Sequence, residues 1–116
     1  MRYMVLIYGS EAQSAQMTPA EQKAEMDAYN VFTQTIQERN VLLGGDSLVP
    51  STSATTVRFR DGKVLTTDGP FAETKEQLGG FYILKCDNLD QAIELAAQVP
   101  GAAYGSIEIR PIVEWN

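Results

Sequence analysis

Two segments that lie far apart in the sequence, Arg2–Tyr8 and Phe81–Cys86, are apolar at almost every position. Successive side chains of a β-strand point to opposite faces, so a strand built from either segment presents an apolar surface on both sides. Such a strand is stable only where both faces are covered. We therefore expect these two segments to form the central strands of a sheet, with other elements packed against both of its faces.

Two helices are predicted from their capping signals. Thr18 and Glu21 have the spacing of a capping box, and the helix that they open extends to about Arg39. Asn88 opens a second helix in the same way, and Pro100–Gly101 ends it. Helical spacing places the buried side chains at Ala28, Tyr29, Phe32 and Ile36 in the first helix and at Leu89, Ala92, Ile93 and Ala96 in the second.

Two further strands are predicted from their patterns. Val41–Val49 is interrupted by Gly44–Gly45, and glycines inside a strand indicate a bulge or the close approach of another group. Ser106–Trp115 is the last strand, and Pro111 within it indicates an edge position because proline cannot donate to a neighbouring strand.

A hairpin is inserted between these strands. Asp61–Gly62 is a favoured pair for a two-residue type I′ turn, so Thr55–Arg60 should pair with Lys63–Thr67. Its basic residues could hold a ligand carboxylate or phosphate, but we favour pairing with Glu73 and Glu76 or simple solvation. The expected register sets Phe59 opposite Val64, Arg58 opposite Leu65, and Arg60 opposite Lys63.

The order of elements predicts an α+β fold. It is that of the split βαβ arrangement, a ferredoxin-like βαββαβ sandwich with an inserted β-hairpin. We expect residues 1–116 to form a single domain. Helices cover one face of such a sheet, and the other apolar face needs a cover as well. We expect that cover to be a second copy of the sheet, which makes the protein a homodimer.

Composition excludes several classes of function. A net charge of −6 disfavours nucleic-acid binding, because a phosphate backbone requires a basic face. The absence of histidine removes the usual general base and the commonest zinc ligand, so we expect no metal and no cofactor. A single cysteine, Cys86, is expected to be a small core residue. No segment has the length and apolarity of a membrane span or a signal peptide, and we expect a cytoplasmic protein.

The segment Asp68–Gly80 carries more chemistry than an ordinary connection between strands. It holds three acids, a lysine, a proline and three glycines. Pro70 restricts the backbone of the turn, Glu73–Glu76 could form one helical turn, and Gly79–Gly80 allows the chain to enter the next strand. Two interpretations remain open, a structural connection and a loop that lines a site. Asp68 and Phe71 are the residues that we expect to line a cleft.

The same segment carries a family resemblance. DGPFAETKEQLGGFYIL resembles the DGPF-domain branch of the YCII-related family, as do RYMVLIYGSEA, TTVRFRDGKVLTTDGPF and YGSIEIRPI. The resemblance implies a dimeric α+β barrel that binds a small ligand between sheet and helices, in several cases a cyclic or aromatic organic acid. It also implies a possible link to extracytoplasmic-function sigma factors.

The resemblance implies candidate site residues. Some similar proteins pair an acid just after the first strand with a histidine on the first helix, and these positions are Glu11 and Tyr29 here. A phenol, with an ordinary pKa of about 10, is a poor base at neutral pH, so Tyr29 would act as a donor. Asp68 is an alternative catalytic acid, with Glu73 and Glu76 nearby. The ligand-binding residues that we expect are Tyr8, Phe71, Arg58 and Glu73.

Two classes of function follow. The first is a proton-transfer enzyme, of isomerase or lyase type, that uses Glu11 and Tyr29 on a small organic ligand. The second is a non-catalytic regulatory or protein-interaction module. A fold that hosts many functions does not choose between them.

Overall fold

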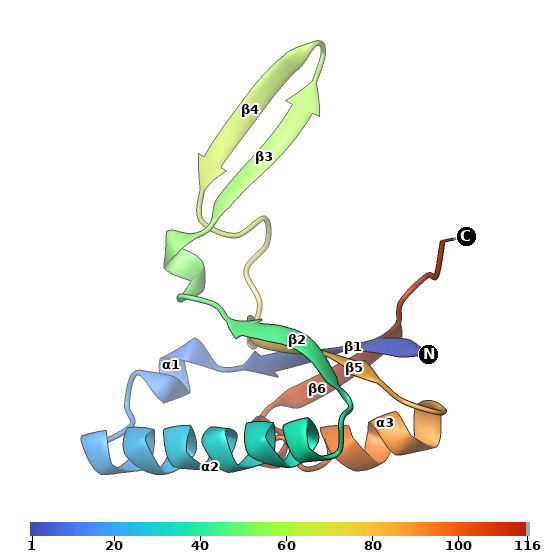
Figure 1. The fold of residues 1–116 in the computed structure, drawn as a ribbon. Coiled ribbons are helices and arrows are strands. Elements are labelled where there is room, and N and C mark those ends of the chain that lie inside the picture. The colour runs from blue at the N-terminus through green and yellow to red at the C-terminus, as the bar shows by residue number, and fades with distance from the viewer. Residues whose placement is uncertain (116) are drawn as a thin grey trace.

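The computed structural model describes residues 1–115 of the 116-residue chain. Along this part of the chain, strands and helices alternate around an inserted hairpin (Figure 1). The elements are β1 Arg2–Gly9, α1 Glu11–Ser14, α2 Pro19–Glu38, β2 Leu42–Ser47, the 3₁₀ turn η1 Ser51–Ser53, β3 Thr55–Arg60, β4 Lys63–Asp68, β5 Gln77–Lys85, α3 Leu89–Ala96, the 3₁₀ turn η2 Pro100–Ala103 and β6 Ser106–Pro111.

The sheet has the predicted ferredoxin-like arrangement. Within residues 1–115, four antiparallel strands lie in the spatial order β2, β5, β1, β6. β1 and β5 occupy the centre, which confirms the prediction from their two apolar faces. β6 lies at an edge and ends at Pro111, as the proline indicated. α2 and α3 cover the same face of the sheet (Figure 1).

The hydrophobic core lies between that face and the helices. Val5, Ile36 and Leu84 are completely buried there. Cys86 is 2% exposed, and burial raises the pKa of its thiol, so it packs as a small apolar residue. Across residues 1–115, no helix is both long enough and apolar enough to cross a membrane.

The capping signals of the helices are confirmed. Thr18 Oγ1 accepts a hydrogen bond from the Glu21 N–H at 3.1 Å, and the Glu21 carboxylate accepts one from the Thr18 N–H at 3.0 Å. Asn88 caps α3 by accepting from the Gln91 N–H at 2.9 Å. These contacts satisfy amide groups that have no partner within the helix.

The prediction of which helix side chains are buried is partly wrong. Ala28 is exposed, and Leu89 and Ile93 are 49% and 50% exposed. α3 has apolar residues on more than one side, so the spacing of apolar residues alone did not identify the face that packs against the sheet. The side chains that α3 buries are Ala92, Leu95 and Ala96.

Several strand bounds differ from the prediction. β2 is shorter than Val41–Val49. β6 ends at Pro111, four residues before Trp115, because the chain leaves the sheet after the Ile112 N–H has donated to the Arg2 carbonyl (Figure 1). β5 begins at Gln77, before the predicted start at Phe81, because the ladder with β1 continues across Gly79 and Gly80. The region 73–76 is not helical. A register shift between Leu42 and Gly44 confirms the bulge that the β2 glycines indicated.

The hairpin of β3 and β4 has the predicted register. Phe59 pairs with Val64, Arg58 with Leu65, and Arg60 with Lys63. The turn residues Asp61 and Gly62 have positive φ angles of 52° and 74°, as a type I′ turn requires. We refer to this hairpin, Thr55–Asp68, as the arm. Figure 1 shows it projecting from the sheet on the side opposite to α2 and α3.

Candidate functional site

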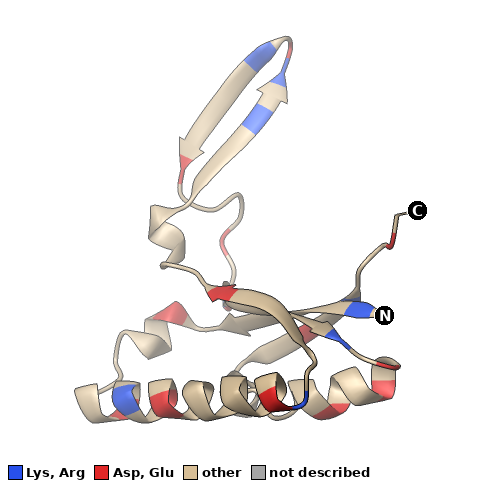
Figure 2. Cartoon of the chain, in the orientation of Figure 1, with Lys and Arg blue, Asp and Glu red and all other residues tan. Residues whose placement is uncertain are grey.

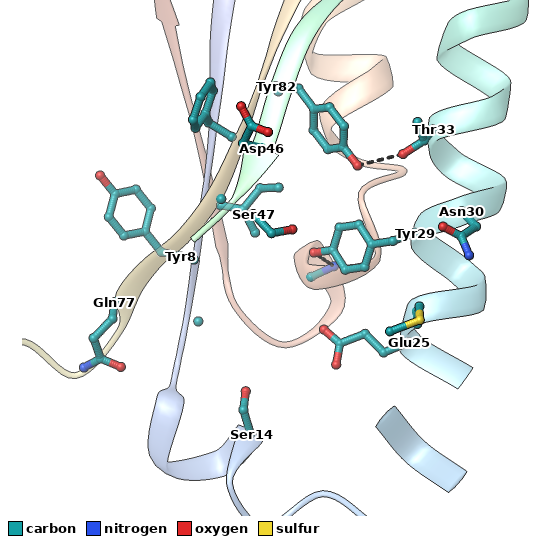
Figure 3. A pocket seen from close by; sticks show the side chains of 18 of the residues that line it. Tyr8, Ser14, Glu25, Tyr29, Asn30, Thr33, Asp46, Ser47, Gln77 and Tyr82 are labelled. Carbon is teal, nitrogen blue, oxygen red and sulfur yellow. Dashed lines mark hydrogen bonds between the residues drawn. The ribbon is translucent and has the colours of Figure 1, made fainter. Parts of the chain in front are cut away.

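A cavity of about 1090 Å³ lies at the end of the sheet where β2 and β5 face α2. The sheet contributes Gly44, Gly45, Gly79 and Gly80 to the lining, and a β-carbon on Gly44 would meet no atom within 4 Å. Figure 3 shows the polar side chains that point into this space. On the helix side of the sheet these include Glu25, Tyr29, Thr33, Ser47 and Tyr82.

Tyr29 is anchored at the centre of this group. Its hydroxyl oxygen accepts a hydrogen bond from the Gly101 N–H at 3.2 Å. In the described part of the chain no group accepts the phenolic proton, so the hydroxyl is free to donate. Burial raises the pKa of Tyr29, and the nearby Glu25 charge acts in the same direction. Tyr29 is therefore a hydrogen-bond donor at neutral pH.

Gly101 is the residue that permits this anchor. A β-carbon placed on Gly101 would lie 2.8 Å from the Tyr29 hydroxyl and 3.4 Å from the Ile7 side chain. A larger residue would displace the phenol, so η2 holds a close contact that only glycine allows.

Glu25 lies one helical turn before Tyr29 and also lines the cavity. The Tyr104 hydroxyl donates a short hydrogen bond to the Glu25 carboxylate. Burial, together with this bond, raises the pKa of Tyr104. The bond engages Oε1, so Oε2 remains available to another donor.

The far wall of the cavity is formed by Thr33 and Tyr82. Their hydroxyl groups are hydrogen-bonded at 2.9 Å (Figure 3). The Tyr82 ring packs edge-on against Phe32, with ring centroids 5.3 Å apart. These contacts join the polar wall to the hydrophobic core and fix its geometry.

Glu11 lines the cavity but has its carboxylate engaged elsewhere. Both of its oxygens accept hydrogen bonds from Ser51, one from the N–H at 2.7 Å and a shorter one from the hydroxyl. The Glu11 N–H donates to the Gln77 side chain at 2.9 Å. Glu11 therefore ties the base of the arm to the end of β1. We refer to the contacts between Glu11 and Ser51 as the latch.

The other predicted ligand-binding residues are spread over the molecule. Tyr8 lines the cavity, but Figure 3 places it on the opposite side of the strands from Tyr29. Its hydroxyl donates to Glu108 at 3.4 Å. Of the remaining candidates none lines the cavity; Arg58 and Asp68 lie on the arm, and Phe71 and Glu73 lie in the segment after it. Phe71 is 78% exposed.

The expected pairing of the basic arm residues is not found. Throughout residues 1–115, the salt bridges are Arg2–Glu114, Lys23–Asp27, Arg39–Glu94 and Arg110–Glu108, and none of them involves the arm. Glu76 instead accepts a hydrogen bond from the Ser106 hydroxyl at 2.7 Å. The arm cations are therefore solvated, which was the other interpretation of this triplet.

The charged side chains that line the cavity carry one sign of charge. Among its described lining residues Glu11, Glu25 and Asp46 are acidic, and none is basic. Across the described chain, no group of three or more histidine, cysteine, aspartate or glutamate residues is arranged to hold a metal. A cavity of this kind favours neutral or hydrogen-bond-donating ligands over anions.

Sequence reasoning missed Glu25, Thr33, Tyr82 and Tyr104. A signal for two of them was present, because Glu25, Tyr29 and Thr33 follow one another at intervals of four residues and so share one side of a helix. Tyr104 carried no comparable signal. Its position beside Glu25 depends on how η2 returns to α2, which local sequence does not specify.

Comparison with known proteins identifies the family. The profile of the YCII-related domain matches residues 1–116. The chain belongs to the YCII-related domain family. A curated relative, the uncharacterized protein R00369 from Rhizobium meliloti (strain 1021), is 38% identical over 114 residues, covering 97% of this chain and 92% of the relative.

A solved structure shares the fold. It is 5-chloro-2-hydroxyhydroquinone dehydrochlorinase (TftG) from Burkholderia phenoliruptrix AC1100, in complex with 2,5-dihydroxybenzoquinone. The TM-score is 0.52, and the match covers 99% of this chain and 96% of that chain at 12% sequence identity. At this identity the likeness supports the fold and does not transfer the activity.

Proposed function

We propose that the cavity binds a small, neutral ring compound with hydroxyl or keto oxygens and transfers a proton on it. The observation that carries this proposal is the combination of a free phenolic donor, Tyr29, with a carboxylate one turn away, Glu25, in a cavity without basic residues among those described. A carboxylate ligand would meet acidic side chains there without a compensating cation. The proposal therefore replaces the organic acid of the family resemblance with a neutral ligand.

The two side chains have different roles. The Glu25 carboxylate removes a proton from the carbon next to a ring carbonyl, and the electron pair moves onto the carbonyl oxygen. Tyr29 donates a hydrogen bond to that oxygen as its negative charge develops. Glu25 then delivers the proton to the carbonyl oxygen, which converts the keto form into the enol form with no change in oxidation state. Glu11 has a positioning role through the latch.

A structural likeness supports this chemistry without establishing it. TftG is named as a dehydrochlorinase and was solved with a dihydroxybenzoquinone, a ring with hydroxyl and keto oxygens. A cavity lined by tyrosine and carboxylate side chains suits a related class of ring.

Calorimetric titration tests the ligand class. We expect hydroquinone, which is neutral at pH 7, to bind more tightly than benzoate, which has the same ring and a negative charge. Tyr29→Phe should weaken hydroquinone binding by about tenfold, because one hydrogen bond is lost. Tyr3→Phe removes the same group from a buried residue outside the cavity and should leave the affinity unchanged. Tighter binding of benzoate would contradict the proposed ligand class.

Hydrogen exchange on a ligand tests the proton transfer. The protein should accelerate the exchange of the ring CH₂ protons of 1,2-cyclohexanedione into D₂O, followed by NMR. Glu25→Gln should abolish this acceleration and retain hydroquinone binding. Binding of hydroquinone without exchange on the diketone by the wild type would favour the non-catalytic alternative.

We also propose that two copies associate through the sheet face that the helices leave open. The side chains on this face are partly exposed and include Met4 opposite Ile83 and Leu6 opposite Phe81. An apolar face of this kind is stabilised by a second copy of the same face.

A second candidate function is an interaction module, which includes the sigma-factor link implied by the resemblance. The exposed arm favours it, because Phe59 and Val64 are 64% and 66% exposed. Exposed apolar residues grouped on one element are typical of a surface that binds another protein.

A further inference from the structure

The arm has two faces of different chemistry. The register of β3 and β4 places Val57, Phe59 and Val64 on one face. These three side chains are 63%, 64% and 66% exposed. The opposite face carries Arg58, Arg60, Lys63 and Leu65.

Within residues 1–115, the apolar face of the arm is exposed to solvent. A two-stranded hairpin alone is marginally stable in water, and it becomes stable when an apolar face packs against another element. In the described structure the arm joins the body at its base (Figure 1). There the latch and the hydrogen bond from the Leu48 N–H to the Gly79 carbonyl hold the chain that enters the arm. We therefore expect the apolar face of the arm to pack against another molecule.

The position of the arm points to what that partner is. The arm projects on the side of the sheet opposite to α2 and α3, which is the side of the open sheet face (Figure 1). A body that covers the open face consequently lies beside the arm. The open sheet face and the arm meet at an angle (Figure 1), and each carries apolar side chains that are at least partly exposed.

Charge points to the same partner. The arm carries three basic and two acidic side chains, a net charge of +1, so the rest of the chain carries −7. Figure 2 shows basic positions along the arm and acidic positions spread over the body. A second copy related by a two-fold axis would place a body of net negative charge beside each arm. Because the basic side chains lie on the face of the arm opposite to the apolar side chains, this attraction acts through net charge.

We propose that the arm is a clasp, in which the apolar face of Val57, Phe59 and Val64 packs against a second copy of this chain. The inference rests on the proposed association through the open sheet face and adds a second, reciprocal contact to it. The latch fixes the direction in which the arm leaves the body, so that each arm extends along its partner.

Analytical ultracentrifugation over a range of micromolar concentrations tests the clasp. We expect the wild type to sediment as a dimer that weakens as salt increases. Phe59→Asp should raise the dissociation constant by about 30-fold or more, as expected for a central apolar contact. Val31→Asp is the matched control, since Val31 is also 64% exposed but lies on α2, away from the arm. This control should sediment like the wild type.

The outcomes separate the clasp from the dimer itself. A wild type that remains monomeric contradicts both proposals. A dimer that Phe59→Asp leaves intact contradicts the clasp alone. Hydrogen exchange provides a second measurement, because β3 and β4 amides should be protected in the dimer and lose protection on dilution to the monomer. Protection that does not change with dilution also contradicts the clasp.

Discussion

The cavity and the arm lie at the same end of the four-stranded sheet, and they differ in how their side chains are held. In the cavity the main polar groups are joined to other elements, as Tyr29 is to Gly101 and Thr33 is to Tyr82. On the arm the cations have no ion-pair partner within the described residues, and the apolar side chains are exposed. Main polar groups of the cavity are thus held by contacts within the described chain, whereas the charged ends of the arm cations and the apolar side chains of the arm face solvent.

This difference explains why two sets of candidates lie apart in space: Glu11 and Tyr29, which the family resemblance indicated, and Asp68 and Phe71, which came from the segment 68–80. Glu11 and Tyr29 lie on segments that end against the sheet, and the fold brings both to the cavity. Asp68 and Phe71 lie where the chain returns from the arm to the body, and neither residue lines the cavity. The segment after the arm is, in this structure, a connection into β5.

The strongest test of the comparison uses the same substitution in the hydrophobic core, which supports the cavity wall through Tyr82 and Phe32, and on the arm. Leu84→Ala should lower the free energy of unfolding by about 3 kcal/mol, because Leu84 is 0% exposed and the change leaves a cavity in the core. Leu65→Ala, on the arm at 48% exposure, should change it by less than about 0.5 kcal/mol. Denaturant unfolding at a fixed protein concentration measures both. Similar losses would show that the arm is as tightly packed as the body.

An intermediate effect is expected at the latch, which joins the two regions. Glu11→Gln should lower the free energy of unfolding by about 1.5 kcal/mol, because the amide cannot accept both hydrogen bonds from Ser51. Ser51→Ala removes only one of them and should have a smaller effect. Amide exchange at η1 should accelerate in both variants. If Glu11→Gln left this exchange unchanged but abolished proton transfer, Glu11 would be the catalytic carboxylate in place of Glu25.

The smallest expected effect is the pH dependence of stability that comes from the capping box of α2. This helix lies in the body and not on the arm. Hydrogen bonds with Thr18 lower the pKa of Glu21 below its ordinary value of 4.5. The stabilisation is therefore present above pH 4.5 and is lost as the pH falls through the lower, folded-state pKa. Glu21→Gln lacks this titration, so the difference in melting temperature between wild type and variant should narrow below pH 4.5. A constant difference would contradict this linkage.

Most of the fold was predictable because its signals are local or strongly patterned. Apolar residues at almost every position identified β1 and β5, the capping box located the start of α2, and Asp61–Gly62 set the register of the arm. The bounds of β2 and β6 were not predictable, since hydrogen bonds to neighbouring strands decide where each ends. The face of α3 that packs was ambiguous for the same reason, because tertiary contacts selected it.

The candidate site was predictable only in part. Glu11 and Tyr29 were expected, and the structure places both on the cavity, where their roles stay predictions. The engagement of Glu11 by Ser51 joins residues 40 positions apart in the sequence. The same holds for Tyr104 and Glu25, which are separated by 79 positions. Contacts of this range depend on the completed topology.

The C-terminal tail gives the protein a built-in optical reporter. Trp115 is the one tryptophan in the sequence and is 89% exposed, while the preceding Glu114 is held to Arg2 by a salt bridge of 3.0 Å. The residue before Trp115 is thus tied to β1 while the indole is immersed in solvent, and its fluorescence should have the red-shifted emission of tryptophan in water. A molecule that binds over this end of the chain would shift the emission of Trp115 to the blue. Such binding could therefore be followed without an added label.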